Sequence, residues 1–414
     1  MVSVNRALFH FNRSVESFSM GDIPCIANFE NGSIIGLDNN GTQLVKQIAR
    51  SGYSAEMISP DQVDMAKAMF ESGFFEATAT CTDNTNVLKS SYIHVTNRCN
   101  LNCAGCYSYD CTRNTKEDLS LEDLKNIMDQ LRESGVDNIT ISGGEPLVRK
   151  DIVQIIHYAR EKCGFSNISL ITNGTVFNPR TVEGLRQYIS EIAVSVDGYD
   201  CEHPTFLRDP GIFDVLMENI PKFQQSGFKV VILPTLHRKN AMNIANYMQL
   251  AKNLEASISF SLMTCSADMQ EYIPTNEQLK ELSNYFDGSS DNLGVKIDSI
   301  DDYNIVARKS CGAGREIISI GAFGEVYPCH MMHQINAVMG NIKDTPLRTI
   351  LDNHKQLPEV DDIKQCSECK YKYVCGGGCK ARAVLLKNDY HDSDPYCEMF
   401  TTFFDNFTAK LKSE

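Results

Sequence analysis

Hydrophobic and polar positions follow two different periods through the middle of the chain. Short apolar runs bounded by turn residues predict strands, with the expected ranges Tyr92–Thr96, Asn138–Ile141, Ile168–Thr172, Ile192–Val196, Lys229–Thr235 and Ser257–Leu262. Between these runs, apolar residues recur at helical spacing. The clearest helix begins after Ser120, a suitable N-cap, and ends near Gly135. Its apolar positions are Leu121, Leu124, Ile127, Met128 and Leu131.

Six strand-then-helix units in succession predict an α/β fold. Such units form a parallel sheet with right-handed crossovers, and six of them make a partial (β/α)6 barrel of the TIM-like type. We expect this barrel to occupy residues 89–304. The carboxyl ends of its strands should meet at one face, where the loops that follow them build a common site.

A smaller unit precedes the barrel, in residues 1–88. Cys25–Phe29 and Ser33–Leu37 have the character of short strands, and the Asn-Asn-Gly sequence at 39–41 has turn chemistry. An amphipathic helix follows, and Pro60 stands in the first turn of a second helix. The pattern predicts a small α+β domain that is winged-helix-like in size.

Composition narrows the classes of function. The chain has 414 residues and a formal net charge of −14, which argues against broad nucleic-acid binding. No apolar run approaches the length of a membrane span, and the first 18 residues lack the apolar core of a signal peptide. We therefore expect a cytoplasmic protein with no nucleic-acid or membrane partner. Its 16 cysteines then stay largely reduced, which favours metal or cluster binding.

Three cysteines lie directly after the first predicted barrel strand. Cys99, Cys103 and Cys106 are separated by three and two residues. Three thiolates can hold three irons of a [4Fe–4S] cluster and leave the fourth iron open to a small chelating ligand. The alternative is a zinc knuckle, which normally needs four protein ligands.

The sequence Cys-Asn-Leu-Asn-Cys-Ala-Gly-Cys-Tyr at 99–107 resembles the signature of radical S-adenosylmethionine (SAM) enzymes. The resemblance covers roughly residues 90–300 and implies a [4Fe–4S] cluster with S-adenosyl-L-methionine as cofactor. Gly143-Gly144-Glu145 at the end of the second strand looks like the family's Gly-Gly-Glu motif, which binds the amino group of the cofactor's methionine. Two glycines let backbone approach a ligand closely, and a carboxylate pairs with an ammonium.

The same resemblance assigns further residues to SAM binding. Positions equivalent to Asn173, Ser195 and Asp197 line the ribose and carboxylate of the cofactor. Arg208 resembles the arginine that pairs with that carboxylate, and Leu236 resembles a residue near the adenine. The expected SAM contacts are Tyr107, Gly143, Gly144, Glu145, Asn173, Ser195, Asp197, Arg208 and Leu236. Singly, some have plainer readings: Asn173-Gly174 is a good turn, and Arg208 suits a solvated surface.

Seven further cysteines follow a second pattern in the loop-rich residues 305–414. Their spacing, with Gly324 before Cys329 and three glycines between Cys375 and Cys379, resembles the SPASM domain of radical peptide- and protein-modifying enzymes. This resemblance implies two auxiliary [4Fe–4S] clusters, and so three clusters in the chain. The first would be held by Cys311, Cys329 and Cys379, and the second by Cys366, Cys369, Cys375 and Cys397. A pair of zinc ribbons is the alternative.

The first auxiliary cluster is one ligand short in this assignment. Either Cys265 reaches in, or one iron stays open and can bind a substrate thiolate; we favour the open iron. Six cysteines remain outside both patterns, namely Cys25, Cys81, Cys111, Cys163, Cys201 and Cys265. Cys111 and Cys201 lie in loops near the expected mouth of the barrel.

Residues 1–88 occupy the position that often holds a peptide-recognition domain in radical enzymes that mature ribosomal peptides. Such domains bind a leader peptide by adding it to a sheet edge. The alternative is a cap that stabilises the barrel.

The two resemblances together imply a radical SAM oxidoreductase that matures a precursor peptide. In the family, a reduced cluster cleaves SAM to a 5′-deoxyadenosyl radical, which takes hydrogen from a substrate carbon. We expect a thioether cross-link to form from a substrate cysteine, with flavodoxin or ferredoxin as electron donor. The alternatives are carbon–carbon cross-linking, epimerisation, formylglycine formation, and a non-enzymatic metal-binding scaffold. No residue stands out as a substrate acid or base.

Overall fold

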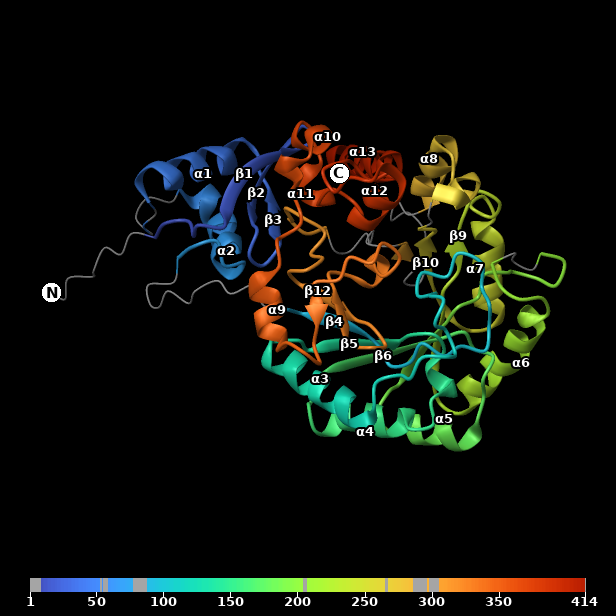
Figure 1. Ribbon diagram of the computed structural model, residues 1–414. Coiled ribbons are helices and arrows are strands. Elements are labelled where there is room, and N and C mark those ends of the chain that lie inside the picture. Colours follow the sequence, from blue (N-terminus) through green and yellow to red (C-terminus); the bar gives the residue numbers. More distant parts are fainter. Residues whose placement is uncertain are drawn as a thin grey trace.

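The computed structural model describes residues 9–52, 54, 59–76, 88–203, 207–264, 267–285, 296–297 and 305–413. A small N-terminal unit lies beside a large sheet covered by helices, and the C-terminal segments lie across one end of that sheet (Figure 1). The expected domain boundaries at 88/89 and 304/305 each adjoin residues outside these ranges, and they stay a proposal.

The N-terminal unit is a three-stranded antiparallel sheet covered by two α-helices. Its strands, in spatial order, are β1 (Val15–Met20), β2 (Ile23–Asn28) and β3 (Ser33–Gly36). The helices are α1 (Asn39–Ser51) and α2 (Val63–Glu71), the latter preceded by the short helix η2 (Pro60–Gln62). Buried Ile26, Leu44, Ile48, Met69 and Phe74 form its own apolar core. The small α+β unit expected from the sequence is therefore present.

One local expectation in this unit is wrong. The Asn-Asn-Gly sequence at 39–41 is not a turn but the first turn of α1. The Asp38 carboxylate accepts a hydrogen bond of 2.6 Å from the Gly41 backbone N–H, which makes Asp38 the N-cap. The cap outweighs the turn preference of the two asparagines and the glycine.

The central sheet contains all six predicted strands, joined in parallel. They are β4 (Ser90–His94), β5 (Asn138–Ser142), β6 (Asn167–Thr172), β7 (Glu191–Val194), β8 (Lys229–Ile232) and β10 (Ser257–Leu262). Each pairs with the next along the chain. The predicted strand Lys229–Thr235 is in fact two, because β9 (Thr235–Leu236) is separate from β8. Pro234 stands between them and has no N–H to donate to a ladder.

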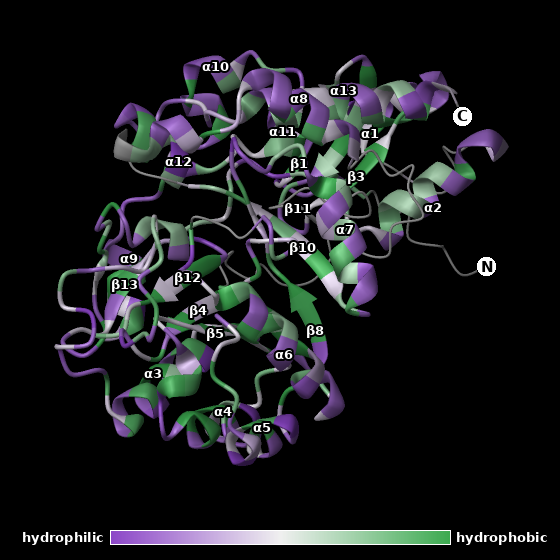
Figure 2. Cartoon of the chain, turned by 90° about the vertical axis from the view of Figure 1, so that its right-hand side faces the viewer, coloured by the Kyte–Doolittle hydropathy of each residue, from purple (hydrophilic) through white to green (hydrophobic). Residues whose placement is uncertain are grey.

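Helices cover the outer face of this sheet. They are α3 (Leu121–Glu133), α4 (Ile152–Glu161), α5 (Pro179–Arg186), α6 (Ile212–Gln225), α7 (Ile244–Asn253) and α8 (Asn276–Tyr285), with short helices η3 (Pro146–Val148) and η4 (Ala267–Tyr272). Ser120 caps α3 as predicted, in a reciprocal pair with Asp123. The apolar residues of α3 that were predicted to face the protein core are buried, except Leu121, which is partly buried. Figure 2 shows apolar and polar residues mixed along these helices and a largely apolar β8.

The C-terminal region adds strands to the same sheet, which the sequence did not predict. β12 (Ile317–Ile320) pairs in parallel with β4, on the side opposite β5 (Figure 1). β13 (Glu325–Tyr327) and β14 (Gly340–Asn341) continue it antiparallel, and β11 (Lys296–Ile297) pairs with β10 at the other edge. The edge of the barrel sheet at β4 is thus paired with residues that are distant in sequence.

The rest of the C-terminal region is built from short helices and one long one. They are η5 (His330–Met332), α9 (Leu347–Asn353), η6 (Val360–Asp362), α10 (Lys364–Ser367), α11 (Lys372–Cys375), α12 (Lys380–Lys387) and α13 (Cys397–Ser413). α13 packs against α8 of the barrel. Within the described ranges, we find no helix with the length and apolar character that crossing a membrane requires.

We expect β12 to be essential to the stability of the whole sheet. Ile318 is fully buried in the main core, so replacing it by alanine leaves a cavity and should lower the free energy of unfolding by about 2–5 kcal/mol. Chemical denaturation measures this change. The matched control is Val338→Ala, at a side chain that is 43% exposed, which should change the free energy little. Equal effects of the two substitutions would contradict a structural role of β12 in the core.

Candidate active site

A cavity of about 560 Å³ lies at the carboxyl ends of the strands. Its walls come from β4–β8, β10 and the C-terminal region together. The cavity is lined by all of the expected SAM contacts except Glu145 and Leu236, and by six cysteines, Cys99, Cys103, Cys106, Cys311, Cys329 and Cys379. Residues expected to bind SAM and residues expected to hold an auxiliary cluster therefore share one enclosed space.

Two arginines, the buried Arg113 and the partly buried Arg208, lie against the first cysteine group. The Arg208 guanidinium Nη1 donates to the Cys103 sulfur at 3.2 Å. Both Nη atoms of Arg113 lie 3.6 Å from the Cys106 sulfur, and Nη2 also donates to Ser108 Oγ at 3.0 Å. Cationic donors stabilise thiolate, the form of cysteine that binds metal. The site is thus prepared for an anionic group.

The three thiols differ in their acidity. Burial raises the pKa of Cys103, and Arg208 offsets this only in part. Burial also raises the pKa of Cys99. At Cys106 burial acts in the same direction, but the charge of Arg113 and hydrogen bonds from Ser108 outweigh it, and the pKa is lowered. Cys106 is therefore the thiol that ionises first.

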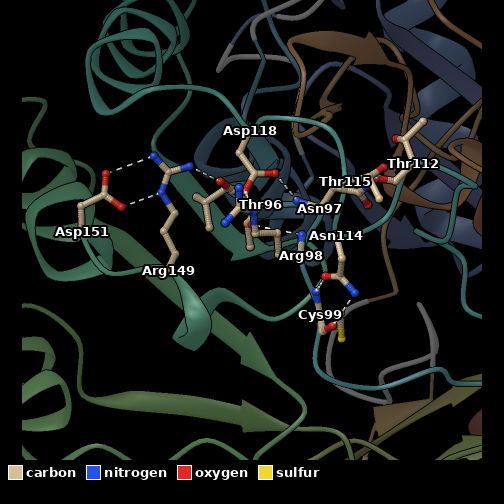
Figure 3. A network of polar contacts seen from close by, with 11 residues as sticks. Thr96, Asn97, Arg98, Cys99, Thr112, Asn114, Thr115, Asp118, Arg149 and Asp151 are labelled. Carbon is tan, nitrogen blue, oxygen red and sulfur yellow. Dashed lines mark hydrogen bonds and ion pairs between the residues drawn. The ribbon is translucent and has the colours of Figure 1, made fainter.

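A network of polar contacts fixes the loop that carries Cys99 (Figure 3). Asn114 accepts from the Cys99 backbone N–H at 2.9 Å and donates to the Cys99 carbonyl at 3.1 Å. The Asp118 carboxylate accepts from Thr96 Oγ1 at 2.6 Å and from the Asn97 backbone N–H at 2.7 Å. Residues after β4 are thereby tied to the segment that leads into α3, which sets the position of the first thiol.

The Gly143-Gly144 pair closes tightly on the same loop. Gly143 has a φ of +139°, and a Cβ there would lie 2.3 Å from the Thr96 carbonyl oxygen. A Cβ on Gly144 would lie 2.2 Å from the Arg98 carbonyl oxygen. The Gly144 N–H donates to the Thr96 carbonyl at 2.8 Å. Only glycine allows this approach of the two strand ends, and the backbone is left open to the cavity.

Glu145 lies behind the cavity wall. Its carboxylate is fully buried and accepts from the Leu147 N–H, the Thr172 hydroxyl and the Asn173 N–H, at 2.9, 2.8 and 2.6 Å. Burial raises its pKa despite these donors. In this arrangement Glu145 joins the ends of β5 and β6, and its direct contact with the methionine of SAM stays a prediction.

Asp197 and Arg208 form an ion pair at the cavity wall. Arg208 Nε donates to Asp197 Oδ2 at 2.5 Å, and the other Asp197 oxygen accepts from the Thr235 N–H at 2.7 Å. The Asp197 side chain is fully buried and that of Arg208 is 20% exposed. Arg208 is therefore not the solvated surface charge that the sequence left open. It connects the first cysteine group to the end of β7.

The other expected SAM contacts differ in their surroundings. Asn173 Nδ2 lies 3.9 Å from the Cys99 sulfur and donates to Asn100 Oδ1 at 2.9 Å. Ser195 lines the cavity, and the Tyr107 hydroxyl lies 3.3 Å from Ser142 Oγ. Leu236 is fully buried in the main core and does not line the cavity, whereas Leu233 and Thr235 do. Its expected contact with adenine stays a prediction.

The first auxiliary group faces the cavity from the C-terminal side. Cys311 is exposed, and Cys329 and Cys379 are partly buried. His330 follows Cys329, and Tyr107 follows Cys106. The centroids of their two rings lie 5.7 Å apart. The aromatic residues next to these two cysteines therefore touch. Cys265, the other candidate ligand, lies outside the described residues.

The remaining four cysteines surround a second and much smaller cavity of about 50 Å³. Cys366, Cys369, Cys375 and Cys397 all line it. Burial raises the pKa of Cys375 to about 12 and that of Cys397 to about 11. Both are thiols at neutral pH without a metal, so binding a cluster here must release protons.

The donor chemistry of the three groups fits iron–sulfur clusters. In the part of the chain that the structure describes, no three Cys, His, Asp or Glu side chains converge closely enough to hold a single metal ion. A zinc ion needs its thiolates at about 2.3 Å in a tetrahedron. Groups of three or four cysteines that line a shared cavity are suited to ligating iron–sulfur clusters.

Sequence reasoning missed several charged or aromatic residues of the site. Arg113 and Arg382 are buried and line the large cavity, as does His330. Arg382 donates to Asp394 Oδ2 at 2.7 Å and stacks over the Tyr396 ring at 4.7 Å. Arg382 follows Cys379 by three residues, so the two lie one helical turn apart, and that spacing was a usable signal. Arg113 lies in an irregular loop, where no period marks its direction.

The cysteines outside the two patterns have ordinary surroundings. Cys25 is buried in the core, and Cys163 lies near the end of α4, where its sulfur is 3.5 Å from Asp129. Cys111 and Cys201 are exposed, and neither lines the large cavity. Cys81 lies outside the described residues.

Two sequence profiles match the parts of the chain that build the site. The profile of the Radical SAM superfamily matches residues 93–251, and that of the SPASM iron–sulfur cluster-binding domain matches residues 311–372. The chain therefore contains a radical SAM domain and a SPASM domain. Its radical SAM domain binds a [4Fe–4S] cluster and SAM, and its SPASM domain binds additional iron–sulfur clusters.

Curated relatives of this radical SAM enzyme have more than one activity. The AdoMet-dependent heme synthase of Methanosarcina barkeri is 27% identical, in a match that covers 76% of this chain and 97% of that protein. The antilisterial bacteriocin subtilosin biosynthesis protein AlbA of Bacillus subtilis is 29% identical, over 72% of this chain and 68% of AlbA.

A solved structure extends the likeness in fold to nearly the whole chain. SuiB of Streptococcus suis, bound to its precursor peptide SuiA, superposes with a TM-score of 0.61 at 16% identity. The match covers 94% of this chain and 100% of SuiB. Such coverage includes most of the N-terminal unit as well as the barrel and the SPASM domain.

We expect Gly143→Ala to weaken SAM binding by more than the backbone strain of an alanine at positive φ would explain. The new Cβ would collide with the Thr96 carbonyl, push the Cys99 loop away, and weaken SAM binding at least tenfold. Gly164→Ala is the matched control. Its φ is +70° with nothing within 4 Å of the added Cβ, so it should cost only about 1–2 kcal/mol of backbone strain. Calorimetric titration with SAM separates the two, and equal affinities would contradict this role of Gly143.

Proposed function

We propose that this enzyme takes hydrogen from a residue of a ribosomally made precursor peptide and forms a thioether cross-link from a cysteine of that peptide. One observation carries the proposal. The first cysteine group and the group of Cys311, Cys329 and Cys379 line a single cavity. A peptide segment in that cavity reaches both groups at once, as a reaction between a carbon and a sulfur of one substrate requires.

The residues on the barrel side would hold the cluster and the SAM that start the reaction. Cys99, Cys103 and Cys106 would ligate the first cluster, with Arg113 and Arg208 balancing the negative charge of the thiolates. Bound together, the cluster and SAM supply the one-electron chemistry that removes a hydrogen atom from an unreactive carbon. Polar groups of Asn173, Ser195 and the Gly144 backbone would position SAM.

The residues on the C-terminal side would receive the substrate cysteine. Three cysteine ligands leave one position of a cubane free, and a thiolate of the peptide would occupy it. Cys311 is exposed, which keeps this side of the cavity accessible. The buried Arg382 lines the same wall and adds positive charge near the incoming thiolate. Cys366, Cys369, Cys375 and Cys397 would hold the second auxiliary cluster, as an electron relay.

The N-terminal unit would bind the leader of the precursor. Among the described strands, β3 pairs only with β2, which leaves its other edge available to an added strand. The likeness in fold to SuiB, whose structure holds a precursor peptide, supports a peptide substrate. We further propose a cytoplasmic location, since cysteines of this number need a reducing compartment, and flavodoxin or ferredoxin as electron donor.

A second candidate function comes from the heme synthase relative. The sequence match to it covers 76% of this chain, and the match to AlbA covers 72%, so sequence coverage does not separate the two candidates. The likeness in fold to SuiB, which holds a precursor peptide and matches 94% of this chain, favours a peptide substrate over a porphyrin.

The thioether proposal predicts a specific mass change. Co-expression with a short cysteine-containing peptide encoded nearby should remove the mass of two hydrogen atoms per link. Thiol alkylation of the product should then find that cysteine blocked, because its sulfur is bonded to carbon. Mass spectrometry measures both. A loss of hydrogen with the thiol still free would instead indicate a carbon–carbon link, and a porphyrin product would indicate the second candidate.

Substitution of cysteines tests where the substrate thiolate binds. Cys311→Ala should abolish the thioether while cleavage of SAM to 5′-deoxyadenosine continues, because Cys311 belongs to the auxiliary group only. Cys201→Ala, at an exposed cysteine that does not line the cavity, is the control and should leave both reactions intact. Thioether formation by the Cys311 variant at the normal rate would contradict the assignment.

Hydrogen–deuterium exchange tests leader binding. Adding the full precursor to the intact enzyme should slow exchange in residues 33–36, since a new strand on β3 protects its amides. A precursor that lacks its leader should leave these amides unprotected. Protection elsewhere without protection at β3 would contradict binding by strand addition.

A further inference from the structure

Lys380 has an environment that its own protein contacts do not explain. It begins α12, directly after Cys379, and is 1% exposed. Its ammonium Nζ has no hydrogen-bond partner within the described residues. Burying an ammonium without a partner is strongly unfavourable, because the charge loses its hydration and gains nothing in return. Burial alone lowers the pKa of Lys380, and an anion beside Nζ would restore its charge.

The neighbours of Lys380 show where that anion would be. A Cβ on Gly377 would lie 3.0 Å from Nζ, so the glycine run between Cys375 and Cys379 leaves room for the ammonium. Nζ thus lies beside the segment that joins the second auxiliary group, at Cys375, to the first, at Cys379. Burial lowers the pKa of Lys380, and the charges of Cys311, from the first group, and of Cys366 and Cys375, from the second, oppose that shift.

The nearby carboxylate is not the missing partner. Asp394 also acts on Lys380, but both of its oxygens are already occupied. Arg382 donates to each of them, at 3.0 and 2.7 Å. The backbone N–H groups of Cys379 and Tyr396 add bonds of 2.6 and 2.9 Å. With Asp394 held by Arg382, the three N–H bonds of the ammonium have no acceptor among the protein groups around it.

We propose that Lys380 is a shared counter-charge for the two auxiliary clusters that the flanking cysteines would hold. The inference rests on the proposed assignment of these cysteines to two clusters. A cluster held by thiolates is a net anion, and it becomes more negative when it is reduced. A fixed cation beside it stabilises the reduced form and raises its reduction potential. A lysine shared by two clusters raises both reduction potentials. The difference between the two potentials, which drives electron transfer from one cluster to the other, therefore changes little.

A redox titration of the reconstituted full-length enzyme tests this role. Lys380→Met keeps the length and apolar stem of the side chain but removes the charge. The midpoint potentials of both auxiliary clusters, followed by electron paramagnetic resonance, should become more negative. The cluster on Cys99, Cys103 and Cys106 should keep its potential and serves as an internal reference. Lys380→Arg should keep the auxiliary potentials close to those of the unmodified enzyme. Lys355→Met, at an exposed lysine that lines neither cavity, should change nothing.

Iron and sulfide analysis covers the case in which the methionine variant assembles poorly. Loss of auxiliary iron in Lys380→Met, with full loading of Lys380→Arg, supports the counter-charge, since arginine keeps the positive charge although its shape differs from that of lysine, whereas methionine lacks the charge. Equal loss in both variants overturns it, because shape would then be the cause. Full loading of Lys380→Met with unchanged potentials overturns it as well. None of these measurements needs the peptide, so they stand even if the proposed cross-linking reaction fails.

Discussion

The pairing of β12 with β4 is the interaction on which the site depends. Four residues from the C-terminal region form a parallel ladder with the strand that leads into the first cysteine group. Cys311 lies shortly before β12, and Cys329 lies just beyond β13 at the other end of the same hairpin. The ladder therefore fixes two of the three first auxiliary cysteines against the barrel mouth. Without it the two groups would not share a cavity.

A second regularity is that each cysteine group has its own buried cation. Arg208 and Arg113 contact the first group, Arg382 lines the wall of the first auxiliary group, and Lys380 lies beside the segment that joins the two auxiliary groups. Thiolates crowd negative charge into a space of low dielectric, where like charges repel strongly. Cations placed within the fold offset that repulsion when the thiols ionise to bind a cluster. The anionic chemistry of the site is thus matched by residues that contribute nothing to an apolar core.

Sequence reasoning found the features that depend on local pattern. The six parallel strands and the capped helix after Ser120 follow from periods and spacings within short windows. The division of the later cysteines into two groups came from the resemblance to the SPASM domain. It missed β12, because the four residues Ile317–Ile320 carry no sign of a partner more than two hundred positions away. It treated Arg208 as a possible surface charge and overlooked Arg113, since the direction of a loop side chain is decided by tertiary contacts. Asp38 overrode the turn signal at 39–41 through one side-chain bond.

The ladder between β4 and β12 also constrains the order in which the molecule is made. The ribosome synthesises β4 long before β12. The edge of β4 that pairs with β12 therefore stays unpaired while the rest of the barrel is synthesised. Exposed strand edges invite pairing with other chains. The cavity is incomplete until Ile317–Ile320 has emerged, and iron supplied before Cys311 is made would meet only the first three cysteines of the site. Folding of the sheet and insertion of the clusters therefore both depend on the pairing of β12 with β4, which comes late in synthesis.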